Sequence, residues 1–149
     1  MVSSQINNMA TWILSYVLFY EFLLTFQQTT AEILLAANAD PNIADHNGET
    51  ALHIAVKKAD CVMTRMLLAK GANPSVVDRH GNAALHTATL YGHLQLIKTL
   101  LKYDADVYQR GHQGAIPSHI AAREGHIHLV QVRELISDLK LMKFIKTFG

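Results

Sequence analysis

Apolar residues in the middle of the chain recur in short groups with helical spacing. Within residues 50–58, Leu52, Ala55 and Val56 fall on one face of a helix. Residues 94–101 carry a second apolar stripe, which suits a second helix packed outside the first. Polar turns that contain glycine separate these stretches, so the pattern predicts pairs of short helices joined by tight turns.

This pattern repeats every 33 residues. Residues 45–60 read DHNGETALHIAVKKAD, and residues 78–93 read DRHGNAALHTATLYGH. The matching positions are Asp45 and Asp78; Gly48, Gly81 and Gly114; Leu52 and Leu85; His53, His86 and His119; and Ala55, Ala88 and Ala121. No single unit can bury its own apolar face, so we expect neighbouring copies to stack and to form one another's core.

The copies resemble ankyrin repeats. The resemblance rests on the stretches GETALHIA, GNAALHTATLYGH and LLAKGANP, and it covers about residues 30–132. It implies an all-α ankyrin-repeat solenoid of stacked helix-turn-helix units, with irregular hydrophobic helices at the N- and C-terminal ends. The units expected are a partial repeat at 30–44, full repeats at 45–77 and 78–110, and an incomplete repeat at 111–132.

Several positions depart from the repeat pattern. Thr50 should cap the inner helix, as the family's threonine does, whereas Ala83 and Ile116 replace it in the later copies and lose that cap. Gly71 stands where a left-handed residue should end the outer helix. Ser118 takes the place of a core leucine, so we expect weaker packing in the last unit.

The N-terminal segment, residues 1–29, contains a long apolar run at residues 9–26. One interpretation is a membrane span over residues 12–26, since about 20 apolar residues cross a bilayer. Another is a degenerate repeat or hydrophobic cap, because Phe19 lies 33 residues before Leu52.

The last segment, residues 133–149, reads RELISDLKLMKFIKTFG and predicts a basic amphipathic helix. Its apolar face favours a cap on the open end of the stack, which solenoids need. The alternative is a helix that binds a membrane or a partner.

The ends also support a third hypothesis, that the chain is a fragment of a longer ankyrin protein. FLLTFQ at residues 22–27 and Val132-Arg133 can be encoded by sequences typical of splice junctions. Both lie where the repeat similarity starts or stops.

Composition narrows the classes of function. The 149-residue chain has 17% charged residues and a net charge of +1, which disfavours nucleic-acid binding. The single cysteine, Cys61, forms no intrachain disulfide and is typical of a reducing compartment. We therefore expect a cytoplasmic or nuclear protein.

Nine histidines raise the question of metal or acid–base chemistry. Five of them occupy family repeat positions, where we expect hydrogen bonds to loop backbone that brace the next turn: His53, His86, His93, His119 and His126. No cysteine or carboxylate pair at metal spacing, phosphate loop or serine-nucleophile motif accompanies them. The prediction is a non-enzymatic protein with no catalytic residue, no metal and no cofactor.

The resemblance implies that hairpin tips and inner helices form one concave face that binds another protein. Mixed aromatic, apolar and charged side chains on a rigid scaffold suit such recognition. The partner-binding residues expected on this face are His46, Asn47, Ile54, Lys57, Lys58, Arg79, His80, Asn82, Thr87, Thr89, Leu90, Tyr91, His112, Gln113 and Arg123.

A narrower resemblance concerns the stretch GANPSVVDRHGNAALHTA and the later stretch GAIPSHIAAREGH. Both are similar to the inhibitory ankyrin region of NF-κB precursors and IκB proteins. This resemblance implies a monomer whose concave face masks a Rel-type transcription factor and holds it in the cytoplasm. The alternatives are a membrane-anchored ankyrin protein and a fragment without independent function.

Overall fold

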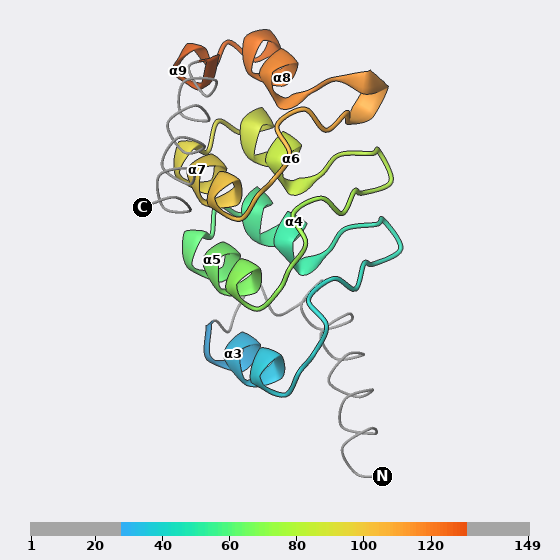
Figure 1. Cartoon of the computed structure of the whole chain (residues 1–149), viewed down its shortest axis with the longest axis vertical. Coiled ribbons are helices and arrows are strands. Elements are labelled where there is room, and N and C mark those ends of the chain that lie inside the picture. The colour runs from blue at the N-terminus through green and yellow to red at the C-terminus, as the bar shows by residue number, and fades with distance from the viewer. Residues whose placement is uncertain (1–27, 131–149) are drawn as a thin grey trace, which may run out of the picture.

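The computed structural model describes residues 28–130, which form two layers of short helices (Figure 1). The inner layer contains α4 (Ala51–Lys57), α6 (Ala84–Leu90) and α8 (Pro117–Arg123). The outer layer contains α3 (Gln28–Ala36), α5 (Cys61–Ala69), α7 (Leu94–Lys102) and α9 (Ile127–Val130). Neighbours within a layer contact one another: α4 with α6, α6 with α8, α3 with α5, and α5 with α7. The predicted all-α stack of helix-turn-helix units is confirmed.

Side chains between the two layers form a continuous hydrophobic core. The inner helices bury Leu52 and Leu85 together with the alanines that recur one turn later, Ala55, Ala88 and Ala121. The outer helices bury Leu67, Leu96, Ile97 and Leu100. Small alanine side chains allow adjacent inner helices to approach closely, so each repeat covers the apolar face of the next.

The inner helices start after an extended residue in all three repeats. At the first start, the hydroxyl of Thr50 lies 2.9 Å from Nδ1 of His53. Ala83 has no hydroxyl, but its backbone N–H still donates to Nδ1 of His86 at 3.2 Å. Proline at the first position of α8 needs no N–H partner there. The loss of threonine is therefore partly offset in the later repeats.

Asp60 begins the outer helix α5 as an N-cap that the sequence analysis did not predict. Its Oδ1 accepts hydrogen bonds from the backbone N–H groups of Val62 (3.1 Å) and Met63 (2.9 Å). At the other end of α5, Gly71 has a φ of 92°, which confirms the predicted left-handed stop. Asp104 takes the same conformation after α7, with a φ of 62°.

Two hairpins project from the stack between the outer and the inner helices (Figure 1). Antiparallel bridges close them, between Ala44 and Thr50 and between Val77 and Ala83. The third repeat differs, because Gly111 replaces the aspartate of the other two and a 3-10 helix, His112–Gly114, forms the tip.

Within residues 28–130 no helix is long and apolar enough to cross a bilayer. The apolar run at 12–26 and the basic tail at 133–149 lie outside the described residues, so both remain predictions. Ser118 in α8 is exposed, whereas Leu52 and Leu85 at the equivalent positions are buried, which agrees with the weaker packing expected in the last unit.

Candidate protein-binding face

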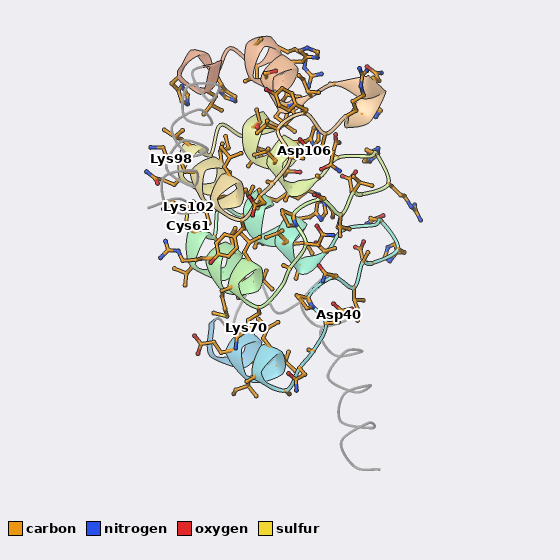
Figure 2. All side chains as sticks on the ribbon, in the orientation of Figure 1. Asp40, Cys61, Lys70, Lys98, Lys102 and Asp106 are labelled. Carbon is orange, nitrogen blue, oxygen red and sulfur yellow. The ribbon has the colours of Figure 1, made fainter. Side chains whose placement is uncertain are left out.

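The hairpin tips and the exposed side of the inner helices form one surface, which we call the recognition face. It comprises the tips at residues 45–48, 78–81 and 111–114 together with α4, α6 and α8. Side chains line this surface along the whole stack, whereas Lys98 and Lys102 lie on α7 in the outer layer (Figure 2). The recognition face therefore collects residues that lie 33 positions apart in the sequence.

Aspartate carboxylates hold the first two tips from inside. Asp45 Oδ1 accepts the backbone N–H groups of Asn47 (2.8 Å) and Glu49 (2.9 Å). Asp78 Oδ1 accepts the corresponding N–H groups two and four residues further on, at 2.8 and 2.9 Å. Such turns satisfy the backbone without regular strand pairing.

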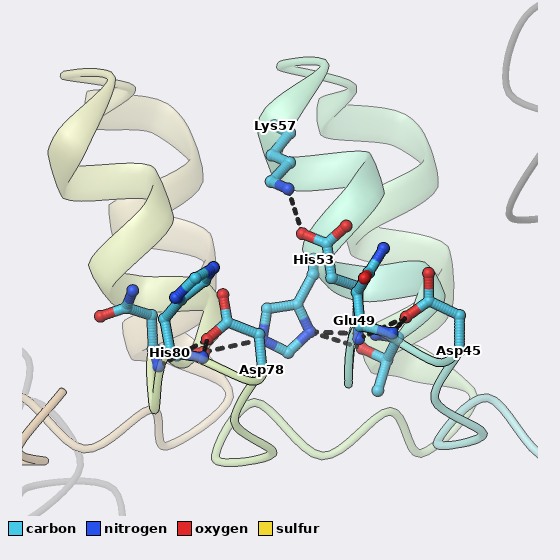
Figure 3. A network of polar contacts seen from close by, with 9 residues as sticks. Asp45, Glu49, His53, Lys57, Asp78 and His80 are labelled. Atoms are coloured by element: carbon cyan, nitrogen blue, oxygen red, sulfur yellow. Dashed lines mark hydrogen bonds and ion pairs between the residues drawn. The ribbon is translucent and has the colours of Figure 1, made fainter. Parts of the chain in front are cut away.

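A buried histidine joins the first full repeat to the second (Figure 3). His53 is 1% exposed, and its Nδ1 accepts the backbone N–H of Thr50 at 3.2 Å. Its Nε2 lies 3.1 Å from the carbonyl oxygen of Asn82. Because Nδ1 must accept, the proton sits on Nε2, which donates across the repeat boundary. Burial lowers the pKa of His53 below its usual value of 6.5.

His86 repeats this geometry one unit later. Its Nδ1 accepts the N–H of Ala83 at 3.2 Å, and its Nε2 donates to the carbonyl of Gln109 at 2.9 Å. Burial again lowers the pKa of the imidazole below 6.5. Both side chains therefore stay neutral at physiological pH and act as braces rather than as acid–base catalysts.

The other three repeat-position histidines behave differently from the prediction. His126 bonds backward, with Nε2 3.1 Å from the carbonyl oxygen of Leu90. His93 stacks on Tyr91 with ring centroids 5.8 Å apart. His119 is exposed, and its ring makes no hydrogen bond within residues 28–130, which contain no further hairpin tip after α8. The prediction of a forward brace is confirmed for His53 and His86 only.

Hydrogen bonds also join neighbouring tips directly. Arg79 N–H donates to the carbonyl of Asn47 at 2.9 Å, and His112 N–H donates to Oδ1 of Asn82 at 3.0 Å. The rings of His80 and His112 meet edge to face with centroids 6.0 Å apart. The three tips therefore form a connected row rather than independent loops.

Most of the side chains expected to bind a partner are accessible. Eleven of them are exposed: His46, Asn47, Lys57, Lys58, Arg79, His80, Leu90, Tyr91, His112, Gln113 and Arg123. Asn82 is half-buried and holds the third tip through its side chain. Lys57, at the end of the first inner helix, forms an ion pair with Glu49, which lies just before that helix (Figure 3).

Three expected partner-binding residues are not on the surface, and their expected exposure was wrong. Ile54 is 9% exposed, Thr87 7% and Thr89 4%. Thr89 turns back on its own helix and donates to the carbonyl of Leu85 at 2.7 Å. Ile54 and Thr87 occupy equivalent positions of α4 and α6, where closely packed inner helices leave little room for solvent.

The structure also reveals a feature that the sequence analysis missed. A pocket of about 100 Å³ opens on the recognition face between α6 and α8. Its lining comprises Asn82, His86, Thr87, Leu90, His112, Ala115, Ile120 and Arg123. The signal was present in the repeat register, where Thr87 and Ala115 are smaller than their counterparts Ile54 and Asn82 in the preceding unit.

Residues 28–130 contain no cluster of three or more His, Cys, Asp or Glu side chains that could hold a metal ion. Cys61 is half-buried at the start of α5 and packs against the core.

These features define a helical-repeat protein with a braced, mixed polar and apolar face. Comparison with family models places it more closely: the model for ankyrin repeats (3 copies) matches residues 24–111. The chain belongs to the ankyrin-repeat family, whose repeats are non-enzymatic modules that mediate protein–protein interaction. A search of curated proteins found no match.

Proposed function

We propose that the recognition face binds a segment of another protein and that the chain acts as a monomeric, non-enzymatic binding module. The observation that carries this proposal is the row of exposed tip residues, which are joined to one another and to the core. Arg79, His80 and His112 are exposed, yet their backbone is held in place. The N–H groups of Arg79 and His112 donate to the preceding repeat, and that of His80 donates to Asp78 in its own tip.

Rigidity is the reason why such a row favours binding. A partner that meets preorganised side chains does not pay the entropy of ordering loops when it binds. Exposed Tyr91 and Arg79 are of residue types enriched among the dominant contacts of protein interfaces.

For the class of partner, we propose a Rel-type transcription factor bound in the manner of IκB proteins, with the complex in the cytoplasm or nucleus. The support is the similarity of GANPSVVDRHGNAALHTA and GAIPSHIAAREGH to the inhibitory ankyrin region of that subgroup. Both stretches contribute to α6, α8 and their tips, which are the part of the recognition face that carries the pocket.

Photo-crosslinking tests the location of binding. Benzoyl-phenylalanine is introduced in place of Arg79 or His112 on the recognition face, and in place of Lys102 on α7 as the matched control. We expect irradiation of cells to yield a discrete crosslinked protein from positions 79 and 112, but none from position 102. Equal capture at all three positions would refute the recognition face.

A titration with a purified Rel-type dimer tests the class of partner separately. Saturable binding that weakens when Arg79 is changed to Glu supports the IκB-like proposal. Absence of binding at micromolar concentration, together with crosslinks to a different protein, would refute that class of partner and leave the recognition face in place.

A further inference from the structure

The pocket between α6 and α8 has a counterpart position one repeat earlier, where the side chains differ. In the groove between α4 and α6, the equivalents of Thr87 and Ala115 are Ile54 and Asn82. The equivalent of Leu90 is Lys57, which forms an ion pair with Glu49. The α6–α8 pocket therefore has smaller side chains at two positions and an apolar leucine in place of an ion-paired lysine.

The size of the pocket restricts its occupant. Its volume is about 100 Å³, whereas pockets for small-molecule ligands are typically about 300–1,000 Å³. An engineered cavity of about 150 Å³ holds benzene, so this smaller pocket suits one aliphatic side chain. Leu90, Ile120 and Ala115 supply an apolar wall for such a group.

Charge at the mouth of the pocket restricts what lies next to that side chain. Arg123 lines the pocket, and its side chain is 62% exposed. Only Nε of Arg123 is engaged, in a 2.9 Å contact with the neighbouring Glu124, so the two terminal nitrogens have no acceptor within residues 28–130. An arginine that presents two terminal nitrogens matches a carboxylate in bidentate geometry.

Half of the lining residues come from a part of the chain with a small excess of positive charge. Residues 110–130 contain two arginines, Arg110 and Arg123, against a single acidic residue, Glu124. The exposed Arg123–Glu124 contact is of a kind that contributes little in water, so a partner carboxylate can replace it at small cost.

We propose that the α6–α8 pocket anchors an aliphatic side chain of the partner, and that Arg123 binds a carboxylate adjacent to it in the partner's chain. The proposal rests on the proposed function of the recognition face, because it names the chemistry that this face selects. The occupant is a short linear segment with Leu, Ile or Val beside Asp or Glu.

The pocket can be closed with residues that the stack already accommodates. Thr87→Ile combined with Ala115→Asn copies the side chains of the preceding groove. Because the stack already holds Ile and Asn at these two positions one repeat earlier, the variant should fold. Arg123→Glu, on the exposed surface, tests the charge without touching the core.

A phage-displayed library of random linear dodecapeptides, selected on the full chain, provides the probe. We expect enrichment of an aliphatic residue next to an acidic one. The selected peptides should bind the Thr87→Ile/Ala115→Asn variant at least about tenfold more weakly, the loss expected for one unburied aliphatic side chain. Arg123→Glu should abolish the acidic preference, and Lys102→Ala, on the outer helix α7, should leave affinity unchanged.

Two results would overturn the inference and are distinguishable from each other. If the pocket variant binds the peptides as tightly as the wild type while Arg79→Glu weakens them, the pocket is not the anchor but the recognition face stands. If no variant on the recognition face affects peptide binding, the proposed function falls as well. Unfolding midpoints of all variants establish that each comparison is between folded proteins.

Discussion

Nε2 of His53 lies 3.1 Å from the carbonyl oxygen of Asn82, which stands 29 residues further along the chain. This bond crosses from one repeat to the tip of the next, and the other ring nitrogen fixes the start of the helix that carries the histidine. One side chain therefore couples helix initiation, repeat stacking and the position of a residue beneath the recognition face.

Replacing His53 with Ala should destabilise the stack by about 2–4 kcal/mol, because it leaves a cavity and two buried backbone groups without a partner. His119→Ala is the matched control: it occupies the same repeat position but is exposed, so its effect should stay within about 0.5 kcal/mol. Urea unfolding followed by circular dichroism measures both. Equal losses would show that the bond across the repeat boundary is not what stabilises the stack.

The repeat register made this brace predictable, but it did not distinguish the three histidines. His53, His86 and His119 occupy equivalent positions in three repeats. The first two are buried and brace the stack because a following loop covers them and accepts their hydrogen bonds. The register alone does not show which of these histidines lies beside the carbonyl group of a following loop.

Exposure on the recognition face was harder to predict than the core. Core positions such as Leu52 and Leu85 follow from helical spacing alone. Thr87 and Thr89 look exposed in a helical projection, yet one faces the next repeat and the other bonds its own helix. Contacts between repeats and local side-chain bonds decide such positions, and a one-dimensional pattern contains neither.

Lowering the pH should destabilise the stack before carboxylates begin to titrate. Burial lowers the pKa of His53 and His86 in the folded state below 6.5, so the unfolded chain binds protons more readily. The stability that the two neutral histidines contribute is fully present above pH 6.5 and is lost as the pH falls below that value. The free energy of unfolding then decreases by at most about 1.4 kcal/mol per pH unit for each histidine.

Urea midpoints measured between pH 8 and pH 5 test this dependence. The wild type should lose stability below pH 6.5, whereas a His53→Gln/His86→Gln variant should show a flatter profile in that range. His119→Gln should keep the wild-type slope. A wild-type profile that stays flat down to pH 5 would be inconsistent with buried neutral braces.

Ala59 occupies a backbone conformation that glycine holds in the other repeats. Its φ is 57°, while Gly92 and Gly125 take 71° and 70° at the equivalent positions. An alanine in the left-handed conformation destabilises the folded state by roughly 1–2 kcal/mol. Glycine removes this strain, but it also increases the entropy of the unfolded chain, which offsets part of the gain in stability. Ala59→Gly should therefore stabilise the protein by about 0.5–1 kcal/mol.

The reverse substitution, Gly92→Ala, provides the control. It should destabilise the stack by more than 1 kcal/mol, because a Cβ at Gly92 would lie 2.9 Å from the ring of His126. Thermal melts of the two single variants should therefore shift in opposite directions. A lower melting midpoint for Ala59→Gly would mean that the strain at this turn is relieved in another way.

Thr64 buries a hydroxyl that has no hydrogen-bond partner in the described part of the chain. The side chain is 0% exposed in α5, and the equivalent residue of α7 is the fully buried Ile97. A buried polar atom without a partner costs about 1–3 kcal/mol relative to a paired one. Thr64→Val keeps the shape and removes the hydroxyl, so it should raise the free energy of unfolding by about 1 kcal/mol.

Thr99→Val tests whether any threonine in an outer helix would give the same gain. The hydroxyl of Thr99 donates to the carbonyl of Gln95 at 2.9 Å on a half-buried surface, so its removal should change stability by less than about 0.5 kcal/mol. If Thr64→Val instead destabilised the full chain, the hydroxyl of Thr64 would not be an unpaired group in the folded protein.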